Sequence, residues 1–183
     1  LASGSAAAIV INSGNANACT GEQGMHDAQR MAQVMADALG VKEQAVFVCS
    51  TGLIGETLPM DVIERGIANA VAQLGADQGQ ASAEAIMTTD TRPKEIAVSF
   101  EVDGKQIHIG GVAKGSGMIH PNMATMLSFV TTDAAVEEEF LKSALSAVAD
   151  ISFNMMTVDG DSSTNDSLIV MANGLAGNQP IAR

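Results

Sequence analysis

The chain contains no tryptophan and no tyrosine, and only 5 of its 183 residues are phenylalanine. Base-stacking platforms are built mainly from aromatic side chains, so the sequence has almost nothing from which to make one. Positive charge is also scarce, because 9 Lys and Arg residues face 21 Asp and Glu residues and give a formal net charge of -12. Such a charge repels nucleic acid and acidic membrane surfaces. We therefore expect a small-molecule partner, no nucleic acid and no membrane.

Cysteine and long apolar runs are equally scarce. The two cysteines, Cys19 and Cys49, form no CxxC pair, which argues against a zinc site and against a disulfide framework. The longest apolar run, 6–11, is far too short to cross a bilayer, and no basic region with a cleavable apolar segment precedes it in the sequence, so we expect neither export nor a membrane anchor. These features predict a cytoplasmic protein without a metal site. The sequence also has no complete dinucleotide-binding fingerprint and no GxxxxGK(S/T) phosphate loop, so we expect no resident cofactor.

The residues that are abundant are small and aliphatic. Hydrophobic residues make up 46% of the chain and charged residues only 16%, so it can bury a sizeable core, and we expect a single domain over 1–183. Apolar residues at helical spacing predict helices at 23–39, 59–74, 81–87 and 134–148, the first closed by Gly40 and the last capped by Asp133.

Short apolar or alternating runs predict the strands. They lie at 7–12, 45–49, 96–100, 107–109, 126–132, 151–158 and 168–172. The dipeptide Asp103-Gly104 is a favoured two-residue turn, so the third and fourth of these strands should form a hairpin. Helices mixed with strands, including a hairpin, predict an α+β fold, arranged as a layered sandwich, more than a uniformly parallel sheet.

The segment 110–133 is the most informative part of the chain. A glycine-rich loop with Pro121 leads to a small residue, Ala124, and then to Thr125 at the start of a hydrophobic strand. A threonine hydroxyl is a poor nucleophile near neutral pH unless a base takes its proton, and its own α-amino group can be that base. That amine titrates at about 7.7 to 8.0 and is free only after the preceding peptide bond is broken. Cleavage and catalysis would therefore be linked, although most threonines at a strand start have no such role.

The run 115–133 closely resembles the processing-site motif of the ornithine acetyltransferases, enzymes of arginine biosynthesis. Further segments agree with this family in order and spacing, namely 12–21, 50–55, 87–91 and 159–166. The resemblance implies the αββα-type sandwich of the ornithine acetyltransferase and N-terminal aminopeptidase superfamily. The family's enzymes are considerably longer than this chain, so we expect a fragment, with further substrate contacts outside it.

The resemblance also implies self-cleavage between Ala124 and Thr125. The piece 1–124 would belong to an α-chain and the piece 125–183 to a β-chain, and the two would stay together in an α2β2 heterotetramer. Thr125 would then take the acetyl group from N2-acetylornithine and pass it to glutamate, in a ping-pong reaction of the cyclic arginine pathway. Acetyl-CoA serves some members of the family as a second donor.

The remaining site residues also come from the resemblance. Thr51 and Gly52 match the positions that stabilise the oxyanion, and a turn after a strand is a suitable place for such donors. Thr88, Lys114 and Thr125 match substrate contacts, although sequence reasoning does not separate Thr88 from Thr89. A lysine can pair with the carboxylate of an amino-acid substrate. The alternative interpretation of Lys114 is a solvated surface lysine without a functional role.

Two other classes of protein remain open at this stage. One is a related N-terminal-nucleophile aminopeptidase or amidase, in which water replaces glutamate as the acceptor, because a fold does not fix its acceptor. The other is a non-enzymatic subunit fragment used only for assembly, which would show neither cleavage nor an acyl-enzyme.

Overall fold

A computed structural model describes residues 4–118 and 126–182 of the chain. It divides into two compact units, Leu1–Thr88 and Thr89–Arg183, called unit 1 and unit 2 below. Each unit has its own sheet and its own helices, and each is described by itself. The single domain expected over 1–183 stays a prediction.

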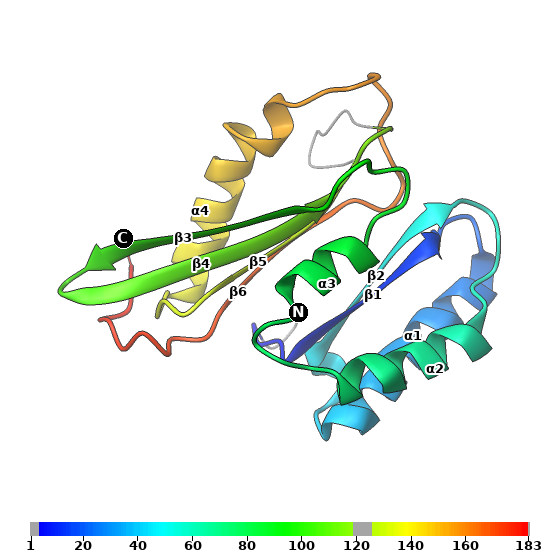
Figure 1. Ribbon diagram of the computed structural model, residues 1–183, viewed down its shortest axis with the longest axis horizontal. Helices are drawn as coiled ribbons and strands as arrows, with labels where there is room; N and C mark the ends of the chain where they lie inside the picture. The colour runs from blue at the N-terminus through cyan, green and yellow to red at the C-terminus, as the bar shows by residue number, and fades with distance from the viewer. Residues whose placement is uncertain (1–3, 119–125, 183) are drawn as a thin grey trace. The chain divides into compact units, whose positions relative to one another are not determined.

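Unit 1 is built on two parallel strands joined by a helix. Its main elements are β1 (Ala8–Asn15), α1 (Gly21–Leu39), β2 (Val46–Leu53), α2 (Met60–Ala72) and α3 (Gly79–Ala85). The strands β1 and β2 lie side by side (Figure 1) and pair in parallel from Ala8 opposite Val46 to Asn15 opposite Leu53. A parallel pair needs a crossover connection, and α1 supplies it.

The core of unit 1 lies where α1 meets the strands and α2. Met31 is completely buried, and it packs in one cluster with Met35, Val10, Val46 and residues from the region of α2. The helix predicted at 23–39 is confirmed, and it ends as expected because Gly40 adopts the left-handed conformation, at φ 67°. The sequence pattern therefore located both the buried face of this helix and its end.

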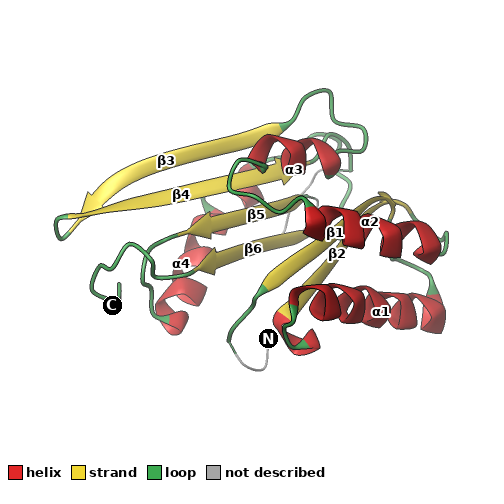
Figure 2. Ribbon diagram, turned by 60° about the horizontal axis from the view of Figure 1, so that its bottom comes forward, coloured by secondary structure: helices red, strands yellow, loops and turns green. Residues whose placement is uncertain are grey.

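Unit 2 is a mixed four-stranded sheet with a helix beside it. Its elements are β3 (Lys94–Val102), β4 (Lys105–Lys114), β5 (Leu127–Thr132), α4 (Glu138–Asp150) and β6 (Ser167–Ala172). The strand order is β3-β4-β5-β6, with two antiparallel pairs followed by the parallel pair of β5 and β6. Figure 2 shows α4 beside this sheet.

The hairpin predicted around Asp103-Gly104 is confirmed as β3 and β4. Both turn residues have positive φ, at 50° and 73°, which is the conformation that a two-residue hairpin turn requires. The strands predicted at 126–132 and 168–172 are confirmed as β5 and β6. Helices and strands are mixed in both units, as the α+β prediction requires.

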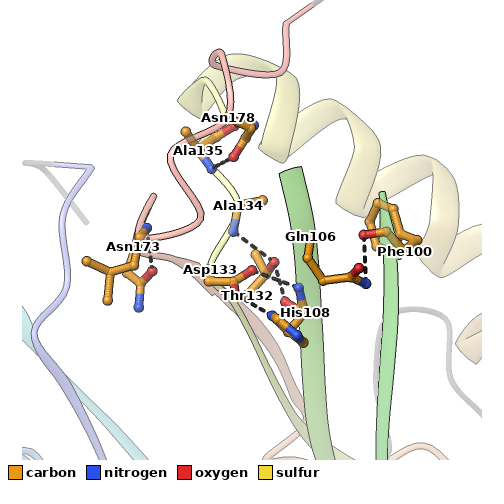
Figure 3. Close-up of polar contacts among 10 residues, drawn as sticks. Phe100, Gln106, His108, Thr132, Asp133, Ala134, Ala135, Asn173 and Asn178 are labelled. Carbon is orange, nitrogen blue, oxygen red and sulfur yellow. Dashed lines mark hydrogen bonds and ion pairs between the residues drawn. The ribbon is translucent and has the colours of Figure 1, made fainter. Parts of the chain in front are cut away.

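Asp133 does not cap a helix, and this prediction is wrong. The helix expected at 134–148 begins at Glu138, and its N-cap is Glu137. Asp133 instead accepts hydrogen bonds from the backbone N–H and the ring of His108 on β4 (Figure 3), at 2.7 Å each. The carboxylate thus found partners in a neighbouring strand, which spacing along the chain does not reveal.

The strand predicted at 151–158 is also wrong. Ile151 is the C-cap of α4, and the chain continues as a 3₁₀ helix at Phe153–Met155. The apolar side chains of Ile151 and Met155 are exposed, at 74% each. A short apolar run has no periodicity that separates a strand from a helix end, so its composition alone was misleading.

Candidate functional site

Thr125 and Ala124, the expected nucleophile and its neighbour, lie outside the described residues. The strand that follows them is present as β5, whose first residue, Leu127, is 2% exposed. Leu127 stands opposite Lys114, the last residue of β4, in the antiparallel pair. The expected substrate contact Lys114 and the start of β5 are therefore neighbours across two strands.

Thr51 and Gly52 lie within β2, not in a turn that follows it. In the parallel pair with β1, Thr51 stands opposite Ser13 and Gly52 opposite Gly14. The two backbones approach so closely that a Cβ on Gly52 would lie 2.2 Å from the carbonyl carbon and oxygen of Gly14. Gly52 also has a φ of 134°, which side chains rarely tolerate. The position therefore admits only glycine.

A polar network supports this end of β1 and β2. The backbone N–H of Asn17 donates to the Ser50 hydroxyl at 2.7 Å, and the Asn17 side-chain amide donates to the Gly24 carbonyl at 2.7 Å. The Thr20 hydroxyl donates to the Asn17 side-chain oxygen at 2.6 Å. Asn17 and Ser50 thus connect the segment 12–21 to β2 beside Thr51. Sequence reasoning matched both segments to the family but assigned neither residue a role.

Lys114 is not a solvated surface lysine. It is only 8% exposed, although it carries an ammonium group. Burial lowers the pKa of Lys114 and is the largest influence on it, while the nearby carboxylates of Asp90 and Asp166 raise this pKa and the ammonium group of Lys94 lowers it. A buried ammonium group can donate charge-assisted hydrogen bonds to an anion, such as a substrate carboxylate.

Asp90 is the residue of this region that sequence reasoning missed. Its side chain is 1% exposed and forms an ion pair with Lys94, four residues later. It also accepts a hydrogen bond from the backbone N–H of Gly115 at 2.8 Å. Its place in the segment 87–91 and the Asp-to-Lys spacing were signals that could have drawn attention to it.

Asp166 carries a second unusual carboxyl group in unit 2. Burial raises its pKa to about 6, while a hydrogen bond with Ser163 and the charge of Lys114 act in the opposite direction. One of its oxygens, Oδ2, is buried and has no hydrogen-bond partner among the described residues. Asp159, in the same motif 159–166, accepts a hydrogen bond from the backbone N–H of Met118 at 2.6 Å.

The expected site residues fall into two groups, one in each unit. Thr51 and Gly52 lie in unit 1 with the network of Asn17, and Lys114 lies in unit 2 with its three charged neighbours. Thr88 and Thr89 are both exposed, and the boundary between the units falls between them. The role of Thr88 as a substrate contact, with Thr89 as the alternative, stays a prediction.

The described residues offer no candidate site for a metal ion and no candidate membrane-spanning helix. No group of three or more His, Cys, Asp and Glu side chains within 4–118 and 126–182 is placed to hold a metal ion. Within the same residues, no helix has both the length and the apolar character needed to cross a membrane.

Known proteins resemble this chain over nearly its whole length. A curated relative from Symbiobacterium thermophilum, the arginine biosynthesis bifunctional protein ArgJ, is 60% identical over 174 residues, which are 95% of this chain and 43% of the relative. The ArgJ of Thermotoga neapolitana is 58% identical and covers 95% of this chain and 44% of its own length. The chain thus spans less than half the length of the curated relatives that it matches.

Two solved structures resemble the chain as well. The crystal structure of ArgJ from Bacillus halodurans has a TM-score of 0.58 and 49% identity, over 64% of this chain and 60% of that one. An ornithine acetyltransferase from Mycobacterium tuberculosis, solved in complex with ornithine, has a TM-score of 0.58 and 40% identity, over 64% and 62%. These likenesses confirm the α+β fold class. The model of the ArgJ family matches residues 1–182, and the chain therefore belongs to the ArgJ family.

Proposed function

We propose that this chain is the part of an arginine-biosynthesis acetyltransferase that transfers an acetyl group from N2-acetylornithine to glutamate. The observation that carries the proposal is the match to the ArgJ family over residues 1–182. The relatives' names place them in arginine biosynthesis, and one structural neighbour is an ornithine acetyltransferase complexed with ornithine. The buried Lys114 supplies a group that suits the carboxylate common to both amino-acid substrates.

In the proposed reaction, the Thr125 hydroxyl attacks the carbonyl of Ala124, the carbon–nitrogen bond between the two residues breaks, and water hydrolyses the resulting ester, so that Thr125 becomes an N-terminal residue with a free α-amine and hydroxyl. Its α-amine takes the hydroxyl proton, and the hydroxyl oxygen attacks the acetyl carbonyl of N2-acetylornithine. The carbonyl carbon–nitrogen bond then breaks, the proton passes to the leaving amine, and ornithine departs from an acetyl ester on Thr125. The amine of glutamate attacks this ester, and the products are N-acetylglutamate and the original hydroxyl.

Each attack passes through a tetrahedral oxyanion, which requires hydrogen-bond donors. Thr51 and Gly52 are the proposed donors. Removing one such donor from an enzyme costs about 3 to 4 kcal/mol of transition-state stabilisation. The close approach of Gly52 to Gly14 and the network of Asn17 and Ser50 support the proposal, because they hold this backbone in one conformation.

Lys114 and Thr88 are the proposed contacts of the amino-acid part of the substrate. One site must accept ornithine derivatives and glutamate in turn, and these share an α-carboxylate. The attraction between an ammonium group and such an anion is stronger where water has little access, because the local dielectric constant is lower. The 8% exposure of Lys114 supports this role.

The proposed pieces, 1–124 and 125–183, would remain associated after cleavage. The strand β4 belongs to the first piece and β5 to the second, and they pair from Ile109 opposite Thr132 to Lys114 opposite Leu127. An α2β2 assembly in the cytoplasm would then be built from two such cleaved chains. The reaction as proposed requires no cofactor, and acetyl-CoA is a second donor to be tested.

A transfer assay with the full-length protein tests this function. With N2-acetylornithine as donor, we expect N-acetylglutamate to appear in step with ornithine, and to depend on added glutamate. Release of free acetate at the same rate without glutamate would instead indicate the related aminopeptidase or amidase. Replacing N2-acetylornithine with acetyl-CoA in the same assay tests the second donor.

A further inference from the structure

Asp90 is a buried charge in an otherwise exposed stretch of chain. Its side chain is 1% exposed, whereas the residues on either side, Thr88, Thr89 and 91–93, are exposed. Removing a carboxylate from water is costly unless it gains charged or hydrogen-bonding partners. The burial of Asp90 therefore calls for a specific set of partners.

Those partners join the beginning of β3 to the end of β4. Lys94, the first residue of β3, forms the ion pair, and the backbone N–H of Gly115, just after β4, donates the hydrogen bond of 2.8 Å. Lys94 and Ala113 are themselves opposite each other in the β3–β4 ladder. Lys114 lies between Ala113 and Gly115, so the Asp90 carboxylate fixes the backbone on its C-terminal side.

The charges around Lys114 oppose one another. Burial lowers the pKa of Lys114, and so does the neighbouring ammonium group of Lys94, whereas Asp90 and Asp166 raise it. Lys114 can bind a carboxylate as an ion pair only while it is protonated. Of the two carboxylates, Asp90 is the one held by both an ion pair and a backbone N–H.

We propose that Asp90 is a positioning residue for Lys114: its carboxylate fixes the backbone after Lys114 and places a negative charge beside the Lys114 ammonium group. Asp90 acts through Lys114 and does not touch the substrate. The catalytic consequence rests on the proposed function, in which Lys114 binds the substrate carboxylate. The electrostatic consequence does not, because it concerns only the charge state of Lys114.

Two variants separate this role from a purely structural one, because they should shift the pKa of Lys114 in opposite directions. In the full-length protein, Asp90→Asn keeps the size of the side chain but removes its charge, so the pKa of Lys114 should fall. Lys94→Gln removes a competing positive charge, so the pKa of Lys114 should rise. Glu101→Gln, an equal loss of charge at an exposed position on β3, is the matched control and should leave this pKa unchanged.

The measurement is a pH titration of the lysine side chains by NMR in protein labelled on lysine, with Lys114 assigned by the Lys114→Arg variant. Opposite shifts in Asp90→Asn and Lys94→Gln would support the proposal. An unchanged Lys114 pKa in folded Asp90→Asn would overturn it. If Asp90→Asn does not fold, Asp90→Ser is titrated in its place, and an unchanged Lys114 pKa in that variant would overturn the proposal in the same way.

Kinetics connect the same variants to catalysis. We expect Asp90→Asn to raise KM for both amino-acid substrates several-fold, and to move the basic limb of kcat/KM to lower pH. A structural defect alone would lower activity without moving that limb. If the NMR shifts appear but the wild type transfers no acetyl group, the proposed function fails and the role of Asp90 stands. If the wild type is active and the pKa of Lys114 is the same in Asp90→Asn as in the wild type, only the proposed role of Asp90 fails.

Discussion

The Asp133 carboxylate holds His108 by two hydrogen bonds, one to the ring Nδ1 and one to the backbone N–H, each 2.7 Å long. The Thr132 hydroxyl donates to the His108 carbonyl at 2.8 Å, so three hydrogen bonds that involve a side chain join His108 on β4 to the end of β5 (Figure 3). The backbone hydrogen bond from His108 is the largest cause that lowers the pKa of Asp133, followed by the bond from the His108 ring.

We expect the contribution of the Asp133–His108 pair to stability to be lost in acid. Because the pKa of Asp133 is lower in the folded state, its contribution is fully present above the ordinary pKa of an aspartate and is lost as the pH falls through the folded value. We expect Asp133→Asn to be less stable than the wild type near neutral pH, with the difference vanishing in acid. Urea unfolding at several pH values measures it. Asp161→Asn, an exposed carboxyl, is the control, and an equal loss in both variants at neutral pH would contradict the prediction.

For Asp166 we expect the opposite dependence of stability on pH. Its pKa is raised to about 6 in the folded state, so the folded protein binds more protons than the unfolded chain between the ordinary aspartate pKa and about 6. Stability from this group therefore falls as the pH rises through that window. We expect Asp166→Asn to gain stability relative to the wild type over the same window, measured by thermal unfolding. A difference between the two proteins that does not change between pH 4 and pH 6 would refute this.

We expect a side chain at position 52 to destabilise the fold by steric clash. An alanine there would place its Cβ 2.2 Å from backbone atoms of Gly14 and would also require a φ of 134°. We expect Gly52→Ala to destabilise the protein by at least about 1 to 3 kcal/mol. Gly66→Ala is the matched control, because Gly66 lies in α2 with open space around it and should gain roughly 0.5 to 1 kcal/mol. Equal stabilities of the two variants in chemical denaturation would contradict the close approach.

We expect the loss of the Lys114 ammonium group to weaken substrate binding. A hydrogen bond to a charged group is worth roughly 1.5 to 3 kcal/mol, so Lys114→Met should raise KM for glutamate and N2-acetylornithine roughly 10- to 150-fold. Lys105→Met, at an exposed position on the same strand, should leave both values near those of the wild type. Steady-state kinetics of the full-length protein measures them. An unchanged KM in Lys114→Met would show that this lysine does not bind the carboxylate.

Local patterns predicted the elements whose form depends on neighbouring residues. The helix ending at Gly40 and the hairpin turning at Asp103-Gly104 follow from periodicity and turn chemistry, and both are present. The bonds from His108 to Asp133 and from Gly115 to Asp90 were beyond such reasoning, because each joins residues that are 25 apart along the chain. The burial and hydrogen bonds of the two carboxylates depend on which strands become neighbours, and no local pattern specifies that.

The candidate site divides in the same way. Motif matches located Thr51, Gly52 and Lys114, and the burial of Lys114 agrees with a role beyond that of a surface lysine. The sequence pattern predicted a turn at Thr51 and Gly52, whereas they continue β2 beside β1. The motif match predicted a role for these residues, whereas the pairing of β1 and β2 determines their backbone conformation.

The central claim is that Thr125 both cleaves the chain and carries the acetyl group. Intact mass measurement of the full-length protein, before and after addition of N2-acetylornithine without glutamate, tests it directly. We predict two pieces in the wild type that meet at Ala124 and Thr125, one acetyl group added to the piece that begins with Thr125, and a single uncut chain in Thr125→Ala. An uncut wild-type chain, or an acetyl group on any other residue, would contradict the account.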